Sequence, residues 1–160
     1  MGQIDSAFVA QRHLDEIAPG CTVIGSNIGE VFRMLNQPDS ALRRDSIADR
    51  FTGKPTAGTA LSLLALSRRA EAEAHLERMK AAYRATPMLP EYMARVAMAL
   101  GRRDEALTWL ERALDERSDL IPYVLQMPEM RPLRADSRVE AMLQRMNAPE
   151  GLRRSIGGTS

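Results

Sequence analysis

Apolar and polar residues alternate along this chain with the period of an α-helix, most clearly between residues 99 and 117. There an apolar run ends at Leu100, Gly101 interrupts it, and Asp104 and Glu105 follow where the next helix would begin. A glycine after a helix end and acidic residues in a first turn are common boundary signals. Small and apolar residues then return every three or four positions, at Ala106, Leu107, Leu110, Ala113 and Leu114. The stretch therefore predicts the turn and second helix of an antiparallel helical hairpin.

The same pattern recurs when the chain is shifted against itself by about 34 residues. The residues that match the stretch 99–112 from 34 positions earlier are Ala65, Leu66, Arg68, Arg69, Glu71, Ala72, Leu76, Glu77 and Arg78. A third copy, at a slightly shorter step, places Gly29, Leu35, Asn36, Ala41 and Leu42 at equivalent positions. The middle copy has Ser67 where the last has Gly101, and Ala70 where the last has an acidic residue. The repetition predicts hairpins at about 25–51, 55–85 and 89–117.

Single helices are predicted on both sides of the hairpins. A lone helix at about residues 4–18, whose hairpin partner is missing, is predicted because several residues match the second half of a repeat: Gly2, Ile4, Asp5, Ala7, Phe8 and Pro19. Near the other end Asp136 or Ser137 can cap a last helix, and Glu140, three residues after Ser137, completes a capping box. We expect this last helix to close the array.

The segment between the last hairpin and the last helix is interrupted by three prolines, Pro122, Pro128 and Pro132. Its apolar residues are Tyr123, Val124, Leu125, Met127 and Met130. We expect them to lie against the open face of the third hairpin. Gly151–Ser160, rich in Gly, Ser and Arg, predicts a disordered tail.

The repeat resembles the tetratricopeptide repeat, with Gly101 at the turn and Ala106 and Ala113 as the small residues of the second helix. The resemblance implies an all-α fold, a right-handed α-solenoid of antiparallel helix hairpins. About three hairpins, an N-terminal single helix and a C-terminal capping helix would form one domain over residues 1–150, followed by the tail at 151–160. Few Val, Ile and aromatic residues also favour helix over sheet.

The chain ending resembles the close of tetratricopeptide arrays in bacterial signalling proteins. The matching residues are Pro132, Leu133, Arg134, Asp136, Arg138, Val139, Leu143, Arg145 and Met146. In that family proline usually follows the aspartate and an aromatic residue comes two positions later, so Ser137 and Val139 depart from the pattern. The resemblance implies an alternative in which the chain is the C-terminal regulatory fragment of a larger transcriptional regulator or nucleotide cyclase. In that case Met1 would begin a fragment, or a further domain would precede it.

Composition excludes some classes of partner. Lys and Arg total 22 against 21 Asp and Glu, which leaves no charge excess for binding nucleic acid directly. The single cysteine, Cys21, excludes an internal disulfide framework and favours a reducing compartment, the cytoplasm. Asp5, Arg12, Asp15 and Glu16 interrupt the apolar residues near the N-terminus, so no signal peptide or membrane span is expected.

No constellation of catalytic or metal-ligating residues is visible. His13, His75 and Cys21 have no partners at a characteristic spacing, and His75 aligns with Trp109, which favours a packing or surface role. The Gly-Gly-Thr at 157–159 has no following helix to form a phosphate loop. We therefore expect no enzyme, no cofactor and no metal. A hydrolase with an unrecognised site is the least favoured hypothesis.

The leading hypothesis is a non-catalytic scaffold that binds a protein or peptide in the concave groove of the array. The repeat register directs these residues toward the groove: Asn27, Glu30, Arg33, Met34, Lys54, Leu61, Tyr92, Arg95 and Met98. Tyr92 and Arg95 are of the types that concentrate binding energy at interfaces. The alternative is that all nine are ordinary exposed positions beside a core. Weak self-association through the N-terminal helix is also expected, because its apolar face lacks a neighbour.

Overall fold

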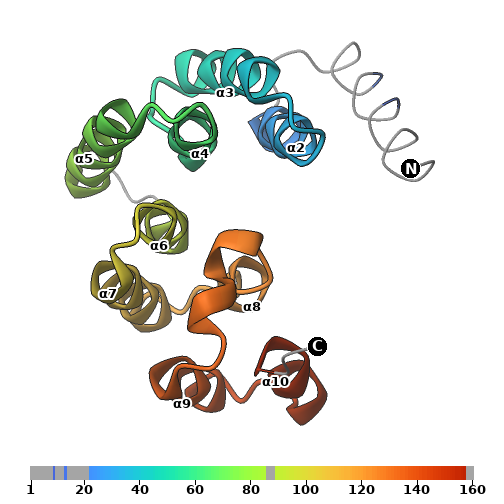
Figure 1. Cartoon of the computed structure of the whole chain (residues 1–160). Coiled ribbons are helices and arrows are strands. Elements are labelled where there is room, and N and C mark those ends of the chain that lie inside the picture. The colour runs from blue at the N-terminus through green and yellow to red at the C-terminus, as the bar shows by residue number, and fades with distance from the viewer. Residues whose placement is uncertain (1–8, 10–12, 14–21, 86–88, 158–160) are drawn as a thin grey trace. The chain divides into compact units, whose positions relative to one another are not determined.

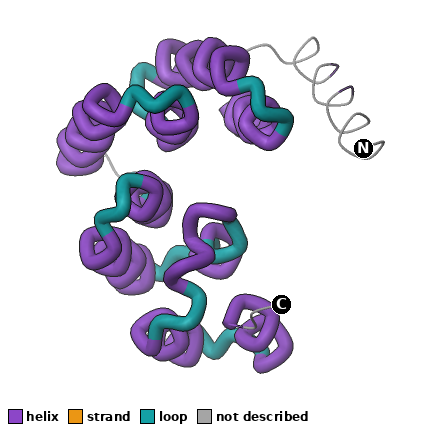
Figure 2. The backbone as a smooth tube through the Cα atoms, viewed as in Figure 1, coloured by secondary structure: helices purple, strands orange, loops and turns teal. Residues whose placement is uncertain are grey.

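The computed structural model describes residues 9, 13, 22–85 and 89–157, with the side chains of 22–27 left out. In these residues all regular secondary structure is helical (Figures 1 and 2). The chain forms two compact units, one up to residue 86 and one from residue 87. Each unit is described by itself, and a single domain over 1–150 stays a prediction. The all-α class is confirmed for the described residues.

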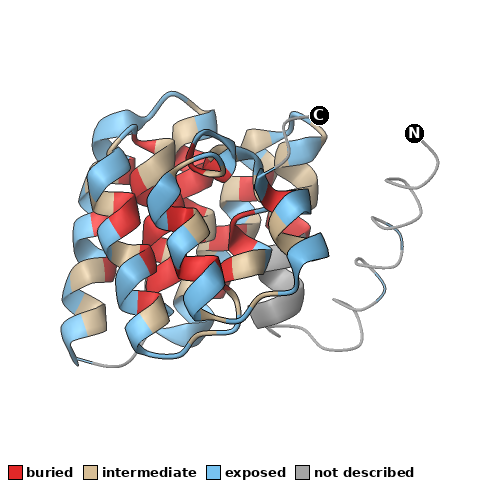
Figure 3. Ribbon diagram, turned by 90° about the horizontal axis from the view of Figure 1, so that it is seen from below, coloured by how far each residue is buried: buried red, intermediate tan, exposed pale blue. Residues whose placement is uncertain are grey.

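The first unit contains four described helices, α2 Thr22–Met34, α3 Pro38–Thr52, α4 Ala57–Ala65 and α5 Arg69–Ala85. Each packs against the next along the chain, and α2 also contacts α4. A connection of three residues joins α2 to α3 and α4 to α5, which makes each pair an antiparallel hairpin. The buried residues gather on the facing sides of the helices (Figure 3) and include Ala41, Ala48, Ala60, Leu63, Ala72, Leu76 and Met79. The hairpins predicted at 25–51 and 55–85 are therefore present.

The second unit begins with the third hairpin, α6 Pro90–Ala99 and α7 Arg103–Asp115. Two short helices follow, α8 Ile121–Val124 and the 3-10 helix η1 Pro128–Leu133, and both pack on α6. Their fully buried residues are Ile121, Val124, Leu125, Met130 and Leu133. The proline-interrupted segment thus covers the third hairpin as its apolar pattern predicts, although Tyr123 is about half exposed.

The three hairpins share one turn geometry. After each first helix comes a residue with left-handed backbone, with φ of 56° at Asn36, 60° at Ser67 and 76° at Gly101. The amide of the next residue donates to the carbonyl five residues back, from Gln37 to Phe32 at 2.8 Å, Arg68 to Leu63 at 2.9 Å and Arg102 to Ala97 at 2.9 Å. These bonds satisfy helix-end carbonyls. The matching turn position in each repeat therefore has the same structure, whichever residue occupies it.

A fully buried alanine follows each turn by five residues, at Ala41, Ala72 and Ala106. Because the methyl group is small, the second helix of each hairpin can approach the first closely. The role assigned to Ala106 from the sequence is confirmed, and its two counterparts share it. Whether the hairpins of both units continue into one right-handed solenoid stays a prediction.

Replacing Ser67 by glycine is expected to stabilise the protein by about 1 kcal/mol, because a side chain in the left-handed region is strained. The reverse change, Gly101→Ser, provides the matched control and is expected to destabilise by about the same amount. A Cβ at Gly101 would meet nothing within 4 Å, so only the backbone angle matters there. Urea denaturation followed by helical circular dichroism measures both, and a destabilising Ser67→Gly would contradict the shared turn.

The last predicted helix is α9 Ser137–Arg145, which packs on α7. Of the two candidate caps, Asp136 is the one used, since its Oδ1 accepts a hydrogen bond of 2.9 Å from the Arg138 amide. Its Oδ2 accepts from Arg103 of α7 at 2.8 Å. The Glu140 carboxylate is bound instead by Gln144 and Arg153. The capping box predicted with Ser137 is therefore replaced by an aspartate cap that also ties α9 to α7.

The prediction of a disordered tail over 151–160 is wrong for its first seven residues, because helix α10 spans Glu150–Gly157 and packs on α9. Ile156 lies four residues after Leu152, on the same face of α10. Ile156 is buried and anchors this short helix. Arg153 adds an ion pair of 3.1 Å to Glu140. The lone helix predicted at 4–18 lies outside the described residues, apart from Val9 and His13, which are helical.

Candidate functional site

The predicted groove residues of the first unit occupy different environments. Glu30 and Arg33 form an ion pair of 2.7 Å on α2, and Met34 beside them is 64% exposed. Lys54 is partly exposed, whereas Leu61 is buried in α4. The side chain of Asn27 lies outside the described part. Of the predicted groove residues whose side chains the structure describes in this unit, Met34 and, less so, Glu30 and Lys54 offer surface to a partner.

The predicted groove residues of the second unit, Tyr92, Arg95 and Met98, recur every three residues along α6. Tyr92 and Met98 are partly exposed. Arg95 is buried, and its Nε donates to the carboxylate of Glu129 in η1. This arginine therefore holds η1 on α6, which is a structural role inside the second unit. The structure brings these three residues together on one helix and leaves them in a different unit from Met34 and Lys54.

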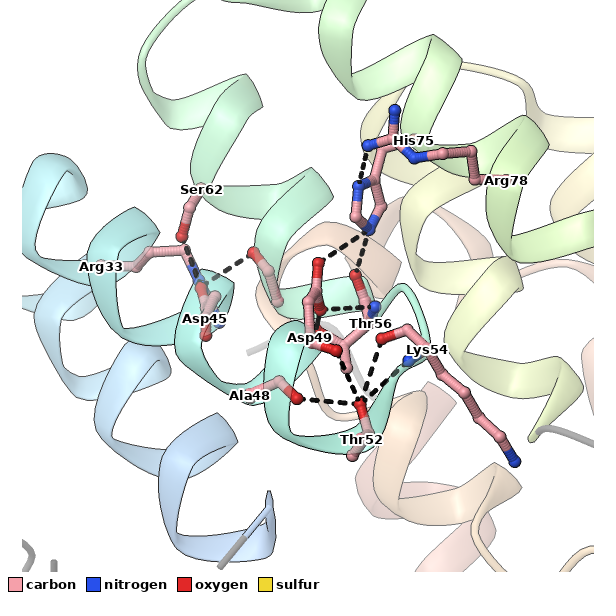
Figure 4. Close-up of polar contacts among 11 residues, drawn as sticks. Arg33, Asp45, Ala48, Asp49, Thr52, Lys54, Thr56, Ser62, His75 and Arg78 are labelled. Atoms are coloured by element: carbon pink, nitrogen blue, oxygen red, sulfur yellow. Dashed lines mark hydrogen bonds and ion pairs between the residues drawn. The ribbon is translucent and has the colours of Figure 1, made fainter. Parts of the chain in front are cut away.

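Arg33 is the centre of a polar cluster that joins α2, α3 and α4 (Figure 4). Its Nη1 donates to Asp45 at 2.6 Å, to the Ser62 hydroxyl at 2.8 Å and to the Gly58 carbonyl at 3.2 Å. Ser62 in turn donates to Asp45 Oδ2 at 2.7 Å. We call Arg33, Asp45, Gly58 and Ser62 the arginine cluster. Because its polar groups satisfy one another, it holds the first hairpin to the second.

Two glycines make room for the buried carboxylate of the arginine cluster. A Cβ on Gly29 would lie 2.0 Å from Asp45 Oδ1, and one on Gly58 would lie 2.6 Å from the same atom. Burial raises the pKa of Asp45 above its ordinary value of 3.8, while Arg33 and the Ser62 hydrogen bond act in the opposite direction. The carboxylate therefore depends on these two partners for its charge, since water does not reach it.

A second cluster lies where α3, α4 and α5 meet (Figure 4). Asp49 Oδ1 accepts from the Thr56 amide at 2.8 Å and from its hydroxyl at 2.6 Å, which fixes the turn before α4. His75 Nε2 of α5 lies 2.9 Å from the Thr56 carbonyl and 3.6 Å from Asp49 Oδ2. Arg78 Nη2 lies 2.7 Å from His75 Nδ1. We call Asp49, Thr56, His75 and Arg78 the histidine cluster.

Burial is the main reason that the pKa of His75 lies below its ordinary value of 6.5, and the charge of Arg78 lowers it further. The charge of Asp49 and the hydrogen bond to the Thr56 carbonyl oppose this shift. The sequence alignment of His75 with Trp109 predicts a packing or surface role. The ring is indeed buried, but it is also the polar link between α5 and the turn before α4.

A second buried carboxylate, that of Glu91 in the first turn of α6, is fully enclosed. Its Oε1 accepts from the Ser118 hydroxyl at 2.8 Å, which ties α6 to the end of α7. Its Oε2 has no hydrogen-bond partner among the described residues. A negative charge at this end of a helix is favourable. An acidic residue next to Pro90 is the sequence signal for a helix start, but nothing in the sequence indicates burial.

Among the described residues, no three His, Cys, Asp or Glu side chains lie together in a way that could hold a metal ion. Each cluster is occupied by its own hydrogen bonds and joins helices. None of the helices in the described part is long and apolar enough to cross a membrane. No protein-family model matches the chain, and no curated protein or solved structure matches it.

Proposed function

We propose that the protein is a non-catalytic helical-repeat scaffold that binds a protein or peptide through the first helices of its hairpins. The observation that supports this most is the recurrence of one turn, with a left-handed residue and a buried alanine five positions later, in all three hairpins. Repeated hairpins that stack present their first helices as one extended surface, which is suited to a peptide or a helix. The polar clusters of the first unit support the same proposal, because they hold consecutive hairpins together.

The binding surface that we propose is narrower than the set expected from the sequence. Arg33, Leu61 and Arg95 are engaged or buried within their units. Met34 and Lys54 in the first unit, and Tyr92 and Met98 in the second, keep exposed surface. Met adapts its shape to different apolar partners, and Tyr often carries much of the energy of an interface. Each unit thus has two proposed contacts of its own.

Site-specific photo-crosslinking in the native cell tests this proposal. A photoreactive amino acid at Tyr92 is expected to capture a discrete partner, and the same amino acid at Thr108, exposed on α7, is the matched control. The partner should then lose at least tenfold in affinity for the purified Tyr92→Ala, Met98→Ala protein, because truncating a central aromatic anchor typically removes about 2 kcal/mol or more. Equal capture from both positions, or unchanged affinity of the double variant, would contradict it.

The alternative proposal is a C-terminal regulatory part of a larger signalling protein. It derives from the ending from Pro132 to Met146, within which Arg134 donates to the carbonyls of Leu125 and Gln126 at 2.7 Å each. An in-frame winged-helix or cyclase segment directly upstream in the genome would favour it. An ordinary start site with a ribosome-binding signal would reject it.

A further inference from the structure

We propose that the histidine cluster is a proton-operated switch, in which protonation of His75 releases Arg78 and strengthens the contact of the ring with Asp49. The switch is independent of the partner-binding proposal, because it lies among α3, α4 and α5 of the first unit. It would make the attachment of α5 to the preceding hairpin depend on pH.

The contacts of the ring define its neutral state. The Thr56 carbonyl can only accept a hydrogen bond, so His75 Nε2, 2.9 Å away, carries the hydrogen. The guanidinium of Arg78 can only donate, so His75 Nδ1, 2.7 Å from Arg78 Nη2, is the acceptor. Both partners therefore select the same tautomer, and the neutral ring makes two hydrogen bonds in its buried position.

A proton added from solvent to Nδ1 removes the acceptor that Arg78 uses. Two cations would then face each other at hydrogen-bond distance, so the guanidinium must move away. Arg78 is on the exposed side of α5, and water can receive it. The new charge on the ring is attracted to Asp49 Oδ2, now 3.6 Å from Nε2. One proton is thus gained, and the hydrogen bond from Arg78 is exchanged for an ion pair with Asp49.

Among the described residues, two charged groups act on the ring. Asp49 faces it from α3 and Arg78 from α5 itself, while the turn before α4 contributes the uncharged carbonyl of Thr56. Asp49 already accepts two hydrogen bonds from Thr56. A stronger attraction to the ring therefore acts directly on the turn that joins α3 to α4.

The direction of the pH effect follows from the lowered pKa of His75. Below pH 6.5 His75 is protonated in the unfolded chain but still neutral in the folded chain, because its pKa is lower in the folded state. A decrease in pH therefore favours the unfolded state, and the free energy of unfolding falls. Above pH 6.5 the neutral His75 makes its full contribution to the stability of the folded state. This contribution is lost between 6.5 and the lower pKa of the folded state, and local opening at α5 should increase over the same interval.

Nitrogen NMR of the two histidine rings tests the switch, with His13→Gln used to assign the signals. At neutral pH we expect His75 in the Nε2–H form, and a titration midpoint below 6.5. In Arg78→Gln the amide can still donate to Nδ1 without a charge, so the midpoint should move upward. Arg84→Gln, which removes another exposed arginine of α5, should leave it unchanged.

Asp49→Asn should move the midpoint in the opposite direction, because the amide oxygen keeps an acceptor for Thr56 but loses the charge. The protection factors of the Thr56 and His75 amides, which correct the exchange rate for its intrinsic pH dependence, should fall below pH 6.5 in the wild type and not in His75→Gln. A His75 midpoint at or above 6.5, or one that Arg78→Gln does not move, would overturn the proposal. These two results can be obtained even if His75→Gln fails to fold.

Discussion

Replacing Arg33 by methionine is expected to lower the free energy of unfolding by about 3–5 kcal/mol, because it leaves a buried carboxylate without its cation. Asp45 is 1% exposed, and Arg33 is the only positively charged group that contacts it in the described structure. Methionine preserves the length and apolar volume of the stem but none of the donors. Amide exchange at the slowest-exchanging positions of α3 and α4 measures the loss at the cluster itself.

Arg43→Met is the matched control for Arg33→Met. Arg43 is exposed on α3 and its one described hydrogen bond, of 3.0 Å, goes to Ser40. Removing such a surface arginine should change stability by no more than about 0.5 kcal/mol. Adding Asp45→Asn to Arg33→Met should recover part of the loss, because the buried charge is then gone. If Arg33→Met were no more harmful than Arg43→Met, the arginine cluster would not hold the hairpins together.

Adding a single methyl group at Gly29 is expected to destabilise the protein by about 1–3 kcal/mol through overpacking. The new Cβ would lie 2.0 Å from Asp45 Oδ1 and 2.7 Å from its Cγ. A free carboxylate would rotate away, but this one is held by Arg33 and Ser62, and Gly58 closes the other side. The expected loss is therefore larger than the helix propensity that alanine gains.

Gly151→Ala in α10 is the control for Gly29→Ala. A Cβ at Gly151 would meet no atom within 4 Å, and its backbone angle is ordinary. Alanine there should be neutral or stabilise by up to about 1 kcal/mol. Urea denaturation of both variants gives the comparison. Equal effects at the two glycines would show that the space around Asp45 is not tight.

Local signals in the sequence predict the hairpins well, because each boundary depends on a few neighbouring residues. Gly101, the acidic first turn after it and Ala106 predict a turn, a helix start and a close approach, and the structure has the turn, the helix start and a fully buried Ala106. Asn36 and Ser67 adopt the same left-handed turn without being glycine. The shift of the chain against itself predicts this equivalence, whereas residue preference alone predicts the left-handed turn at Asn36 but not at Ser67.

The candidate site is less predictable because its partners are distant in sequence. Helix register directs Arg33 and Arg95 toward a groove. In the structure Arg33 instead binds Asp45, 12 residues along the chain. Arg95 binds Glu129, 34 residues along the chain. A charged residue is usually exposed unless such a partner exists. The pattern of one helix cannot show the partner. The same reason explains why the space that Gly29 provides for Asp45 is not visible in the sequence.

The tail illustrates a different limit. A composition rich in Gly, Ser and Arg favours disorder, but Ile156 needs only the neighbouring α9 as a surface on which to be buried. Arg153 then reaches Glu140. Composition averages over a segment, so it does not detect one anchoring side chain.

Backbone carbon chemical shifts test most directly whether one hairpin is repeated along this chain. Left-handed shifts are expected at Asn36, Ser67 and Gly101, each between two helical runs, and Ser67 is decisive because it is the least favourable residue of the three. A continuous helix through Ser67, or extended shifts on either side of it, would contradict the repeated hairpin and the scaffold proposed from it.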